Sequence, residues 1–310
     1  MSEPPARACI VIPCYNAETW ITRTVGSALA QDWPGLEVVV VDDGSSDGSV
    51  AVVEAMKDPR LTLLTGANCG ACHARNRGLA WATECGMDYV VFLDADDYFE
   101  GDVLGGAMRV ALAHEADMVL SNLHVEEGTG PRVMRHLYQG QVAPEAFFRG
   151  WMQGDYVSPP GILWRVAFLN SVGGWDESLA RAQDLEVTLR ALLSQPVIWK
   201  NEEGAAVYDR ANPDSISRSQ SRKALDSRYR AVSGLLSKIP GTSFADSAPL
   251  LSRELYHIAR AAFVAGYTDL GRTALIAARS TGYRDHPGTR LHRLAARLLG
   301  LETKIRLWKN

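Results

Sequence analysis

The 310-residue chain lacks several features that would place it in other protein classes. It has no uninterrupted apolar run near the roughly 18–20 residues of a membrane-spanning helix. Its first residues lack the basic region of a secretory signal, and the short apolar run after them is a strand candidate instead. These absences predict a cytoplasmic protein, which can still lie peripherally at the inner face of a membrane.

Cysteine is scarce and unevenly placed. The five cysteines are an odd number and all lie in the first 90 residues (Cys9, Cys14, Cys69, Cys72, Cys85). This pattern argues against a disulfide framework. Cys69 and Cys72 have the spacing of redox or zinc motifs, but neither a second pair nor a His pair accompanies them. The spacing therefore gives little support to a zinc site.

Charge divides the chain in two. Residues 1–221 contain 16 Lys and Arg against 30 Asp and Glu, a net charge of −14, whereas residues 222–310 contain 16 against 6, a net charge of +10. This division predicts a catalytic domain over 1–221 and a basic region over 222–310 that faces something anionic.

The first 125 residues alternate between strand and helix patterns. Apolar runs predict strands at 9–13, 36–41, 61–64, 89–93 and 118–125, with helices between them at 17–31, 47–56, 70–85 and 102–114. A continuous β-branched run such as 36–41 is typical of a strand buried on both faces. The alternation predicts an α/β fold with a Rossmann-like, mostly parallel sheet flanked by helices.

The pattern changes after this region. Between about 127 and 183 the sequence is irregular and rich in aromatic residues and proline, which serve either as core or as binding residues (Trp151, Tyr156, Pro159, Pro160, Trp164, Trp175). From about 222 onward the pattern is helical, and residues 254–278 have the small-residue spacing of a helix pair.

The C-terminal segment forms a narrow apolar seam at helical spacing, interrupted by Gly300 (Leu291, Leu294, Leu298, Leu301, Ile305, Trp308). Residues 284–310 contain seven Lys and Arg against two acidic residues. A basic amphipathic helix of this kind lies on an anionic membrane surface, pairs with a partner or a second copy, or docks on its own domain. The sequence leaves these three alternatives open.

An acidic cluster follows the strand predicted at 89–93. Asp94, Asp96 and Asp97 stand within four positions, and the carboxyl end of a strand is where open α/β sheets bind ligands. Clustered carboxylates repel one another, and hard oxygen ligands suit Mg²⁺ or Mn²⁺. The alternative is a solvated acidic turn.

Other polar segments follow predicted strands or begin helices. Tyr15 follows the first strand, where an aromatic ring either packs on a planar base or belongs to the core. Asp42 and Asp43 end the second strand, where carboxylates accept hydrogen bonds from a base or a ribose, or cap a turn. Arg75 stands in a Gly-rich segment that starts a helix, where it contacts either phosphate or a carboxylate. Asp184 follows a Gly-Gly turn and stands in the first turn of a helix, as a base or as a cap.

These motifs together resemble the family 2 glycosyltransferases, which have the GT-A fold. The resemblance covers roughly residues 8–220, and its segments occur in the family's order (13–16, 42–45, 68–78, 94–97, 173–184). It implies an inverting transfer from a nucleotide sugar, most often a UDP-sugar, to a hydroxyl group of a glycan or lipid-linked acceptor. Polysaccharide or cell-envelope synthesis is the process that this resemblance suggests.

The resemblance also implies roles for the nucleotide-binding residues. Asp43, with or without Asp42, would contact the base, and Pro13 and Tyr15 would lie near it. Arg75 would border the nucleotide.

The remaining roles concern the sugar transfer itself. By the same resemblance Asp94 would approach the ribose, and Asp96 of the DXD motif would ligate manganese or magnesium, with Asp97 as a second contact. Asp184 would take the proton from the acceptor hydroxyl as the general base.

The sequence departs from the family pattern in two respects. Asn212 stands where many members have a His that contacts metal or phosphate, and Arg210 or Arg218 would then compensate. The Gln-X-X-Arg-Trp motif and the membrane helices of the processive synthases are missing, which favours single additions. Two alternatives remain: a nucleotidyltransferase-like enzyme on a similar sheet, and a catalytically silent scaffold that binds a partner through its basic helices.

Overall fold

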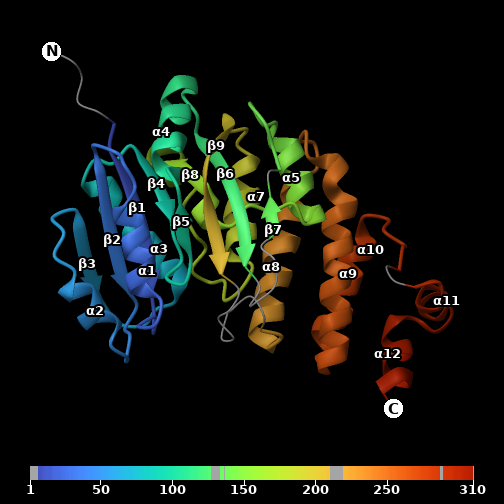
Figure 1. The fold of residues 1–310 in the computed structure, drawn as a ribbon. Helices are drawn as coiled ribbons and strands as arrows, with labels where there is room; N and C mark the ends of the chain where they lie inside the picture. Colours follow the sequence, from blue (N-terminus) through green and yellow to red (C-terminus); the bar gives the residue numbers. More distant parts are fainter. Residues whose placement is uncertain (1–5, 127–132, 136, 210–218, 287–288, 310) are drawn as a thin grey trace.

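The computed structural model describes residues 6–126, 133–135, 137–209, 219–286 and 289–309. Within these residues the chain forms one mixed sheet with helices packed on both faces, followed by a group of C-terminal helices (Figure 1). The strands of this sheet run in the order β3-β2-β1-β4-β8-β6-β9-β5, and β7 pairs with β6. The α/β fold class predicted from the sequence is confirmed.

The strands of the sheet are β1 (Ala8–Cys14), β2 (Leu36–Asp42), β3 (Leu61–Thr65), β4 (Tyr89–Phe92), β5 (Tyr98–Glu100), β6 (Met118–Glu126), β7 (Val133–Arg135), β8 (Ile162–Arg165) and β9 (Ile198–Asp209). The helices on this sheet are α1 (Ile21–Leu29), α2 (Ser49–Ala55), α3 (Ala71–Glu84), α4 (Val103–His114), α5 (Pro144–Gln153), α6 (Val166–Ser171) and α7 (Gln183–Leu192). The C-terminal helices are α8 (Arg222–Lys238), α9 (Ala248–Ala265), α10 (Thr268–Ser280), α11 (Arg290–Leu299) and α12 (Leu301–Lys309).

The pairing is parallel over the first half of the sheet and mixed beyond it. β1 pairs in parallel with both β2 and β4, so that Cys14 is level with Asp42 and Val11 with Phe92. β8 is antiparallel to both β4 and β6, and β5 is antiparallel to β9. The expected parallel pairing thus holds for β3-β2-β1-β4, and the carboxyl ends of β1, β2 and β4 meet at one edge.

The two faces of the sheet bury two separate clusters of apolar side chains. Along β1, Cys9 and Val11 belong to one cluster, whereas Ile10 and Ile12 belong to the other. This is the alternation expected of a strand that is covered on both faces. Gly78 of α3 lies directly over β1, because a Cβ atom there would stand 2.2 Å from Val11 Cγ1.

Two of the four aromatic residues named above for this region, and both prolines, lie in the core. Trp164 is 1% exposed and Trp175 is 3% exposed, and Pro159 and Pro160 are also buried. The regular strand in this region is short: β8 has only four residues and directly follows a turn at Pro159–Gly161. This is why the sequence shows no clear strand pattern here. Trp151 and Tyr156 are half-buried.

The C-terminal helices begin where the charge changes sign. α8 starts at Arg222 and packs against α7, and α9 packs against α5. One apolar cluster includes Val187 and Leu189 of α7 together with Leu235 of α8 and Leu255 of α9. The division at 221/222 therefore coincides with a helix start, while the core continues across it. It stays a prediction as a domain boundary.

The apolar seam predicted near the C-terminus is not one continuous helix. Gly300 has a φ of 77° and separates α11 from α12. Leu301 is 1% exposed, whereas Leu298 is 74% exposed. The seam therefore divides into a buried part and an exposed part, and the side chain of Trp308 lies outside the described residues. None of the described helices combines the length and apolarity needed to cross a membrane.

Candidate active site

Five chain segments meet around the carboxyl edge formed by β1, β2 and β4. They are the turn after β1, the turn after β2, the acidic turn after β4, the start of α3 and the start of α7. Parallel strands bring their carboxyl ends to the same edge, and this edge is where α/β sheets bind ligands. The structure thus brings together the segments that the sequence singled out.

The two carboxylates after β2 organise the surrounding loops. Asp43 is 5% exposed, and its Oδ1 and Oδ2 accept hydrogen bonds from the backbone N–H groups of Cys69 and Gly70, each at 2.8 Å. Asp42 Oδ2 accepts from the N–H groups of Gly44 and Ser45, each at 3.1 Å. Turn chemistry therefore accounts for both carboxylates.

One oxygen of this pair has a different environment. Asp42 Oδ1 is buried, and no described group lies in hydrogen-bond geometry to it. A buried carboxylate oxygen without a partner is costly, so a ligand donor at this point would relieve the cost. The base contact predicted for Asp42 and Asp43 stays a prediction, now with an available acceptor.

The turn after β1 presents an exposed aromatic ring. Tyr15 is 52% exposed, so its interpretation as a core residue is wrong, and Pro13 beside it is half-buried. Asn16 follows in the left-handed region with a φ of 49°; its Oδ1 accepts from Ser46 N–H at 2.8 Å, and its N–H donates to Ser45 Oγ at 2.9 Å. Asn16 therefore ties the turn after β1 to the turn after β2.

The acidic turn after β4 is partly buried. Asp97 is fully buried, and its Oδ1 accepts from Asp209 N–H at 3.0 Å, so this residue does not fit a solvated turn. Burial raises the pKa of Asp97 well above its usual range, and the nearby Asp94 and Asp96 carboxylates add to the effect. Asp94 and Asp96 are half-buried.

Two residues of α1 hold the backbone of this turn, and the sequence did not single them out. Arg23 donates from Nη2 to the Asp96 carbonyl at 2.8 Å and to Asp209 Oδ2 at 2.9 Å. Thr24 Oγ1 lies 2.8 Å from the carbonyl oxygens of Ala95 and Asp97. Both lie inside an ordinary amphipathic helix, where no local pattern distinguishes them.

Arg75 joins the acidic turn to the start of α7. It is 5% exposed and donates from Nη2 to Asp94 Oδ1 at 2.5 Å and from Nη1 to Gln183 Oε1 at 3.1 Å. Its guanidinium lies 5.8 Å from the ring centroid of Trp175. Burial alone would lower the pKa of Arg75, but the Asp94 and Asp184 carboxylates outweigh it and raise that pKa.

Asp184 lies in the first turn of α7, as the sequence predicts. It is half-buried, and its Oδ1 lies in hydrogen-bond geometry to no group in the described part of the chain. Burial raises the pKa of Asp184; the Arg75 guanidinium opposes that rise and the Asp94 carboxylate adds to it. Asp184 is therefore a more basic carboxylate than a solvated one, which suits a proton acceptor.

The Gly-Gly turn before α7 is fixed by α3. Asn76 accepts from Trp175 N–H and donates to the Trp175 carbonyl, both at 2.9 Å. Gly174 has a φ of 60°, and a Cβ atom there would stand 2.7 Å from Asn76 Oδ1. Trp175 packs edge-on against Phe92 of β4 at 4.3 Å. Contacts of Arg75, Asn76 and Trp175 thus fix the position of the acidic turn relative to α7.

The metal predicted at the acidic turn fits the side chains there. The described residues contain no group of three or more His, Cys, Asp and Glu side chains arranged for a metal. Mg²⁺ in nucleotide enzymes is held by only one or two carboxylates together with substrate phosphates. Burial, and after it the nearby Asp94 and Asp96 carboxylates, raise the pKa of Asp97, and a cation bound at this turn would offset the repulsion among the three carboxylates.

Other predicted features lie elsewhere or outside the described residues. Cys69 is exposed and Cys72 is buried, and both are free thiols, so the structure gives no support to a zinc or redox pair. Arg210, Asn212 and Arg218 lie outside the described residues.

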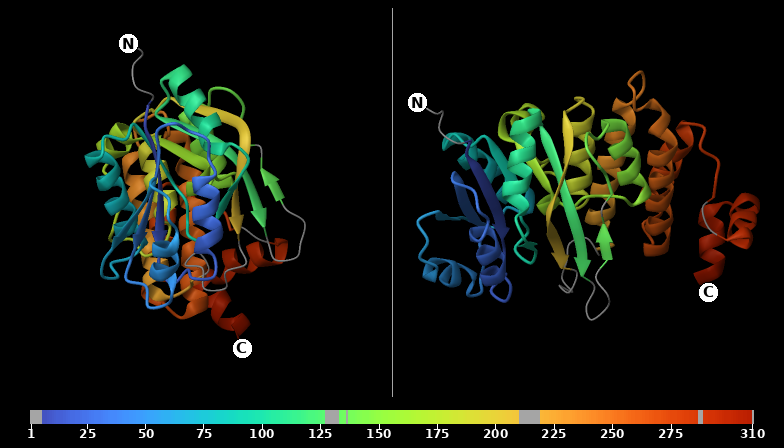
Figure 2. Two further views of the ribbon diagram at one scale, coloured as in Figure 1. Left: turned by 60° about the vertical axis from the view of Figure 1, so that its left-hand side comes forward. Right: turned by 45° about the horizontal axis from the view of Figure 1, so that its top comes forward.

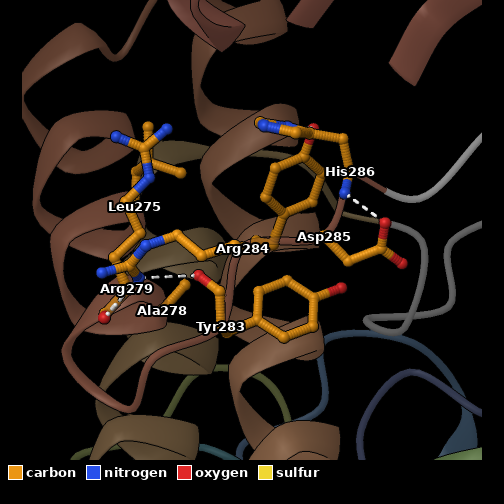
Figure 3. A pocket seen from close by; sticks show the side chains of 8 residues that line it. Leu275, Ala278, Arg279, Tyr283, Arg284, Asp285 and His286 are labelled. Carbon is orange, nitrogen blue, oxygen red and sulfur yellow. Dashed lines mark hydrogen bonds between the residues drawn. The ribbon is translucent and has the colours of Figure 1, made fainter. Parts of the chain in front are cut away.

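A cavity of about 290 Å³ lies away from the carboxyl edge, among the C-terminal helices (Figure 3). Its lining includes Tyr256 of α9, Leu275 of α10 and His286 after α10. The cavity shares no lining residue with the five segments described above, so it is not the candidate active site.

Comparison with known proteins gives a consistent result. A family described as Glycosyl transferase family 2 matches residues 9–165. An uncharacterized glycosyltransferase, YibD, from Escherichia coli is 37% identical over 115 residues, covering 36% of this chain and 33% of that protein. The Staphylococcus aureus poly(ribitol-phosphate) beta-N-acetylglucosaminyltransferase TarS is 29% identical over 191 residues, covering 60% of this chain and 32% of that protein.

Two solved structures have a similar fold. TarS residues 1–349 in complex with UDP-GlcNAc align with a TM-score of 0.64 at 21% identity, over 92% of this chain and 95% of that chain. The mannosyltransferase PcManGT from Pyrobaculum calidifontis, in complex with GDP-Man and Mn²⁺, aligns with a TM-score of 0.54 at 20% identity, over 99% and 85%. At these identities the likeness supports the GT-A fold alone.

Proposed function

The chain belongs to glycosyl transferase family 2, and from this premise we propose that it transfers a sugar from a nucleoside-diphosphate sugar to an acceptor hydroxyl with inversion of configuration. One observation carries the proposal. The buried Arg75 guanidinium bonds to Asp94 of the acidic turn and to Gln183 beside Asp184. A donor-binding motif and a basic carboxylate therefore border the same charged group.

We assign the donor to the edge formed by β1 and β2. Tyr15 offers an exposed ring for a base, and the buried Asp42 Oδ1 offers an acceptor for a base N–H or a ribose hydroxyl. A UDP-sugar is the donor we favour, and the UDP-GlcNAc complex of the similar TarS structure supports that choice. Asp94 would approach the ribose while keeping its hydrogen bond to Arg75.

Asp96 would hold a divalent cation, with Asp97 behind it as a second carboxylate. Mn²⁺ or Mg²⁺ bound there would offset the negative charge that develops on the departing diphosphate. Arg23 contributes by fixing the Asp96 backbone, because its guanidinium bonds to that carbonyl and to Asp209 together.

Asp184 acts as the general base. Its carboxylate takes the proton of the acceptor hydroxyl, the hydroxyl oxygen forms a bond to the anomeric carbon, and the bond from that carbon to the diphosphate oxygen breaks. A single displacement of this kind inverts the anomeric centre and needs no covalent intermediate. The nucleoside diphosphate and the glycosylated acceptor are the products.

We assign the acceptor to the class of glycan or lipid-linked hydroxyls, at the cytoplasmic side of the cell envelope. The relative TarS, whose name gives poly(ribitol-phosphate) as its acceptor, supports a polymeric envelope acceptor. Residues 1–221 carry a net negative charge and residues 222–310 a net positive charge. The C-terminal helices are therefore the part of the chain suited to contact an anionic surface.

The proposal is tested by incubating the protein with UDP-, GDP-, TDP- and CDP-sugars, Mn²⁺ and a panel of glycan and lipid-linked acceptors. We expect release of a nucleoside diphosphate and a product with inverted configuration by NMR. Absence of this release, with pyrophosphate formed instead when a nucleoside triphosphate and a sugar 1-phosphate are supplied, would point to nucleotidyl transfer. Nucleotide binding without turnover on any acceptor, together with unchanged binding in Asp184→Asn, would favour the scaffold interpretation.

A further inference from the structure

Helix α11 presents an apolar stripe to solvent. Leu291, Leu294 and Leu298 are 66%, 56% and 74% exposed, whereas Ala296 is 1% exposed. With 3.6 residues per turn, the three leucines lie along one stripe and Ala296 lies nearly opposite, against the protein. α11 therefore turns Ala296 and the half-buried Ala295 toward the rest of the chain and directs Leu291, Leu294 and Leu298 outward.

The exposure does not come from a loosely attached helix, because the chain is fixed on both sides of α11. After it, Leu301 is buried at 1% exposure, and Glu302 of α12 accepts two hydrogen bonds from Arg272 of α10, at 2.8 and 2.9 Å. Before it, the buried His286 lies with Nδ1 3.0 Å from the Tyr256 hydroxyl. The leucine stripe is thus held in its outward orientation.

The border of the stripe is strongly basic. Arg290, Arg293 and Arg297 are exposed, and α11 contains no acidic residue. On a helical wheel these arginines lie along one side of the leucine stripe, next to Leu294. The acidic Glu302 of α12 is already paired with Arg272. An outward apolar stripe bordered by guanidinium groups matches the acyl and phosphate layers of an anionic lipid surface.

We propose that α11 binds the surface of an anionic membrane, with the leucine stripe in the acyl boundary and the three arginines at the lipid phosphates. A second copy of the chain is a poorer occupant, because a symmetric pairing would oppose two stripes bordered by the same positive charge. Figure 1 and the right-hand view of Figure 2 place α11 and α12 at the end of the molecule opposite β3. A membrane bound there leaves the edge of β1 and β2 open to donor.

The inference deepens the proposed function, since it would hold the enzyme at the layer that carries lipid-linked acceptors. It does not depend on that function physically, and the two are tested separately. The probe is co-sedimentation of the full chain with vesicles of phosphatidylcholine alone or of phosphatidylcholine with phosphatidylglycerol. We expect binding to the phosphatidylglycerol vesicles that weakens as salt is raised, and little binding to the neutral ones.

Variants at exposed positions identify the surface without touching the core. Replacing the three leucines with Gln should reduce the partition coefficient at least tenfold, whereas Leu112→Gln, at a 46% exposed position of α4, should leave it unchanged. Replacing the three arginines with Gln should reduce it by roughly fivefold per residue, or about a hundredfold in all. A matched set at exposed basic positions elsewhere, Lys57, Arg149 and Lys223, should have little effect.

The outcomes separate the alternatives. Equal binding to neutral and anionic vesicles, or binding that survives both triple variants, would overturn the inference. A dimer in light scattering that the leucine variant dissociates, without vesicle binding, would overturn it and assign the stripe to a second copy. Nucleotide-dependent thermal shifts measured on the same variants report on the donor site. Vesicle binding with no donor turnover would remove the proposed function and leave this inference standing.

Discussion

Replacing Arg75 with Met is expected to destabilise the protein by about 3 kcal/mol, because it removes a buried positive charge that lies next to the half-buried Asp94 and Asp184 carboxylates. The guanidinium is 5% exposed and bonds to Asp94 at 2.5 Å and to Gln183 at 3.1 Å. Breaking a buried ion pair typically costs about 3–5 kcal/mol. The Asp94 side chain keeps 28% exposure, which places this pair at the lower end of that range.

Urea unfolding of wild type and Arg75→Met measures the difference. The matched control is Arg60→Met, which breaks the Arg60–Asp58 pair at 2.8 Å on the surface, where the expected loss is below about 1 kcal/mol. Adding Asp94→Asn to Arg75→Met should recover part of the stability, since it removes the carboxylate left without its partner. An Arg75→Met variant as stable as the Arg60→Met control would refute the account of this pair.

The same substitution should change the pH dependence of activity. Asp184 must be ionised to accept a proton, so activity should rise with pH through its pKa, which burial holds above the ordinary carboxyl range. Arg75 lowers this pKa, so its loss should move the rising limb to higher pH. A limb that stays in place, or moves to lower pH, would contradict the electrostatic coupling between Arg75 and Asp184.

Four further predictions follow from the geometry of the site. Asp184→Asn should keep nucleotide affinity and lower turnover by about 10²–10⁴-fold, and near-normal turnover would remove it as the base. Asp96→Ala should abolish the Mn²⁺ dependence of nucleotide binding in calorimetry, and unchanged dependence would remove it as a ligand. Asp43→Ala should cost about 2–4 kcal/mol in urea unfolding, because two backbone donors lose a charged acceptor; a loss below 1 kcal/mol would contradict this. Gly174→Ala should destabilise more than Gly86→Ala, since both have positive φ but only the first places a Cβ atom against another side chain, and equal losses would exclude that contact.

Strands and helices with a clear apolar pattern were predictable from the sequence. The apolar runs at 9–13 and 36–41 became β1 and β2, and nearly every residue of both strands is buried. The strands β8 and β9 were not anticipated. β8 is four residues long and follows a proline turn, and β9 carries charged residues and a glycine within its length.

Candidate site residues could be located from the sequence when they stand next to a strand end or a helix start. Residues that reach the site only through long-range contacts could not. The placement of Asp42, Asp94 and Asp184 was predictable because each stands at the end of a strand or the start of a helix, while their roles stay predictions. Arg23 was not predictable, because its two hydrogen bonds join residues 73 and 186 positions away. The sequence left the exposure of Tyr15 open, since an aromatic residue after a buried strand can lie in the core or at the surface; the structure places it at the surface.

Thermal unfolding with UDP, GDP, TDP and CDP, each with and without Mn²⁺, tests the central claim most directly. Stabilisation reaches about 2.7 kcal/mol when the ligand is at a hundredfold excess over its Kd. The account predicts a Mn²⁺-dependent rise in Tm with one nucleotide, UDP first, which disappears in Asp96→Ala and persists in Asp184→Asn. No rise with any nucleotide in the presence of Mn²⁺ would contradict a donor site at the edge of β1, β2 and β4.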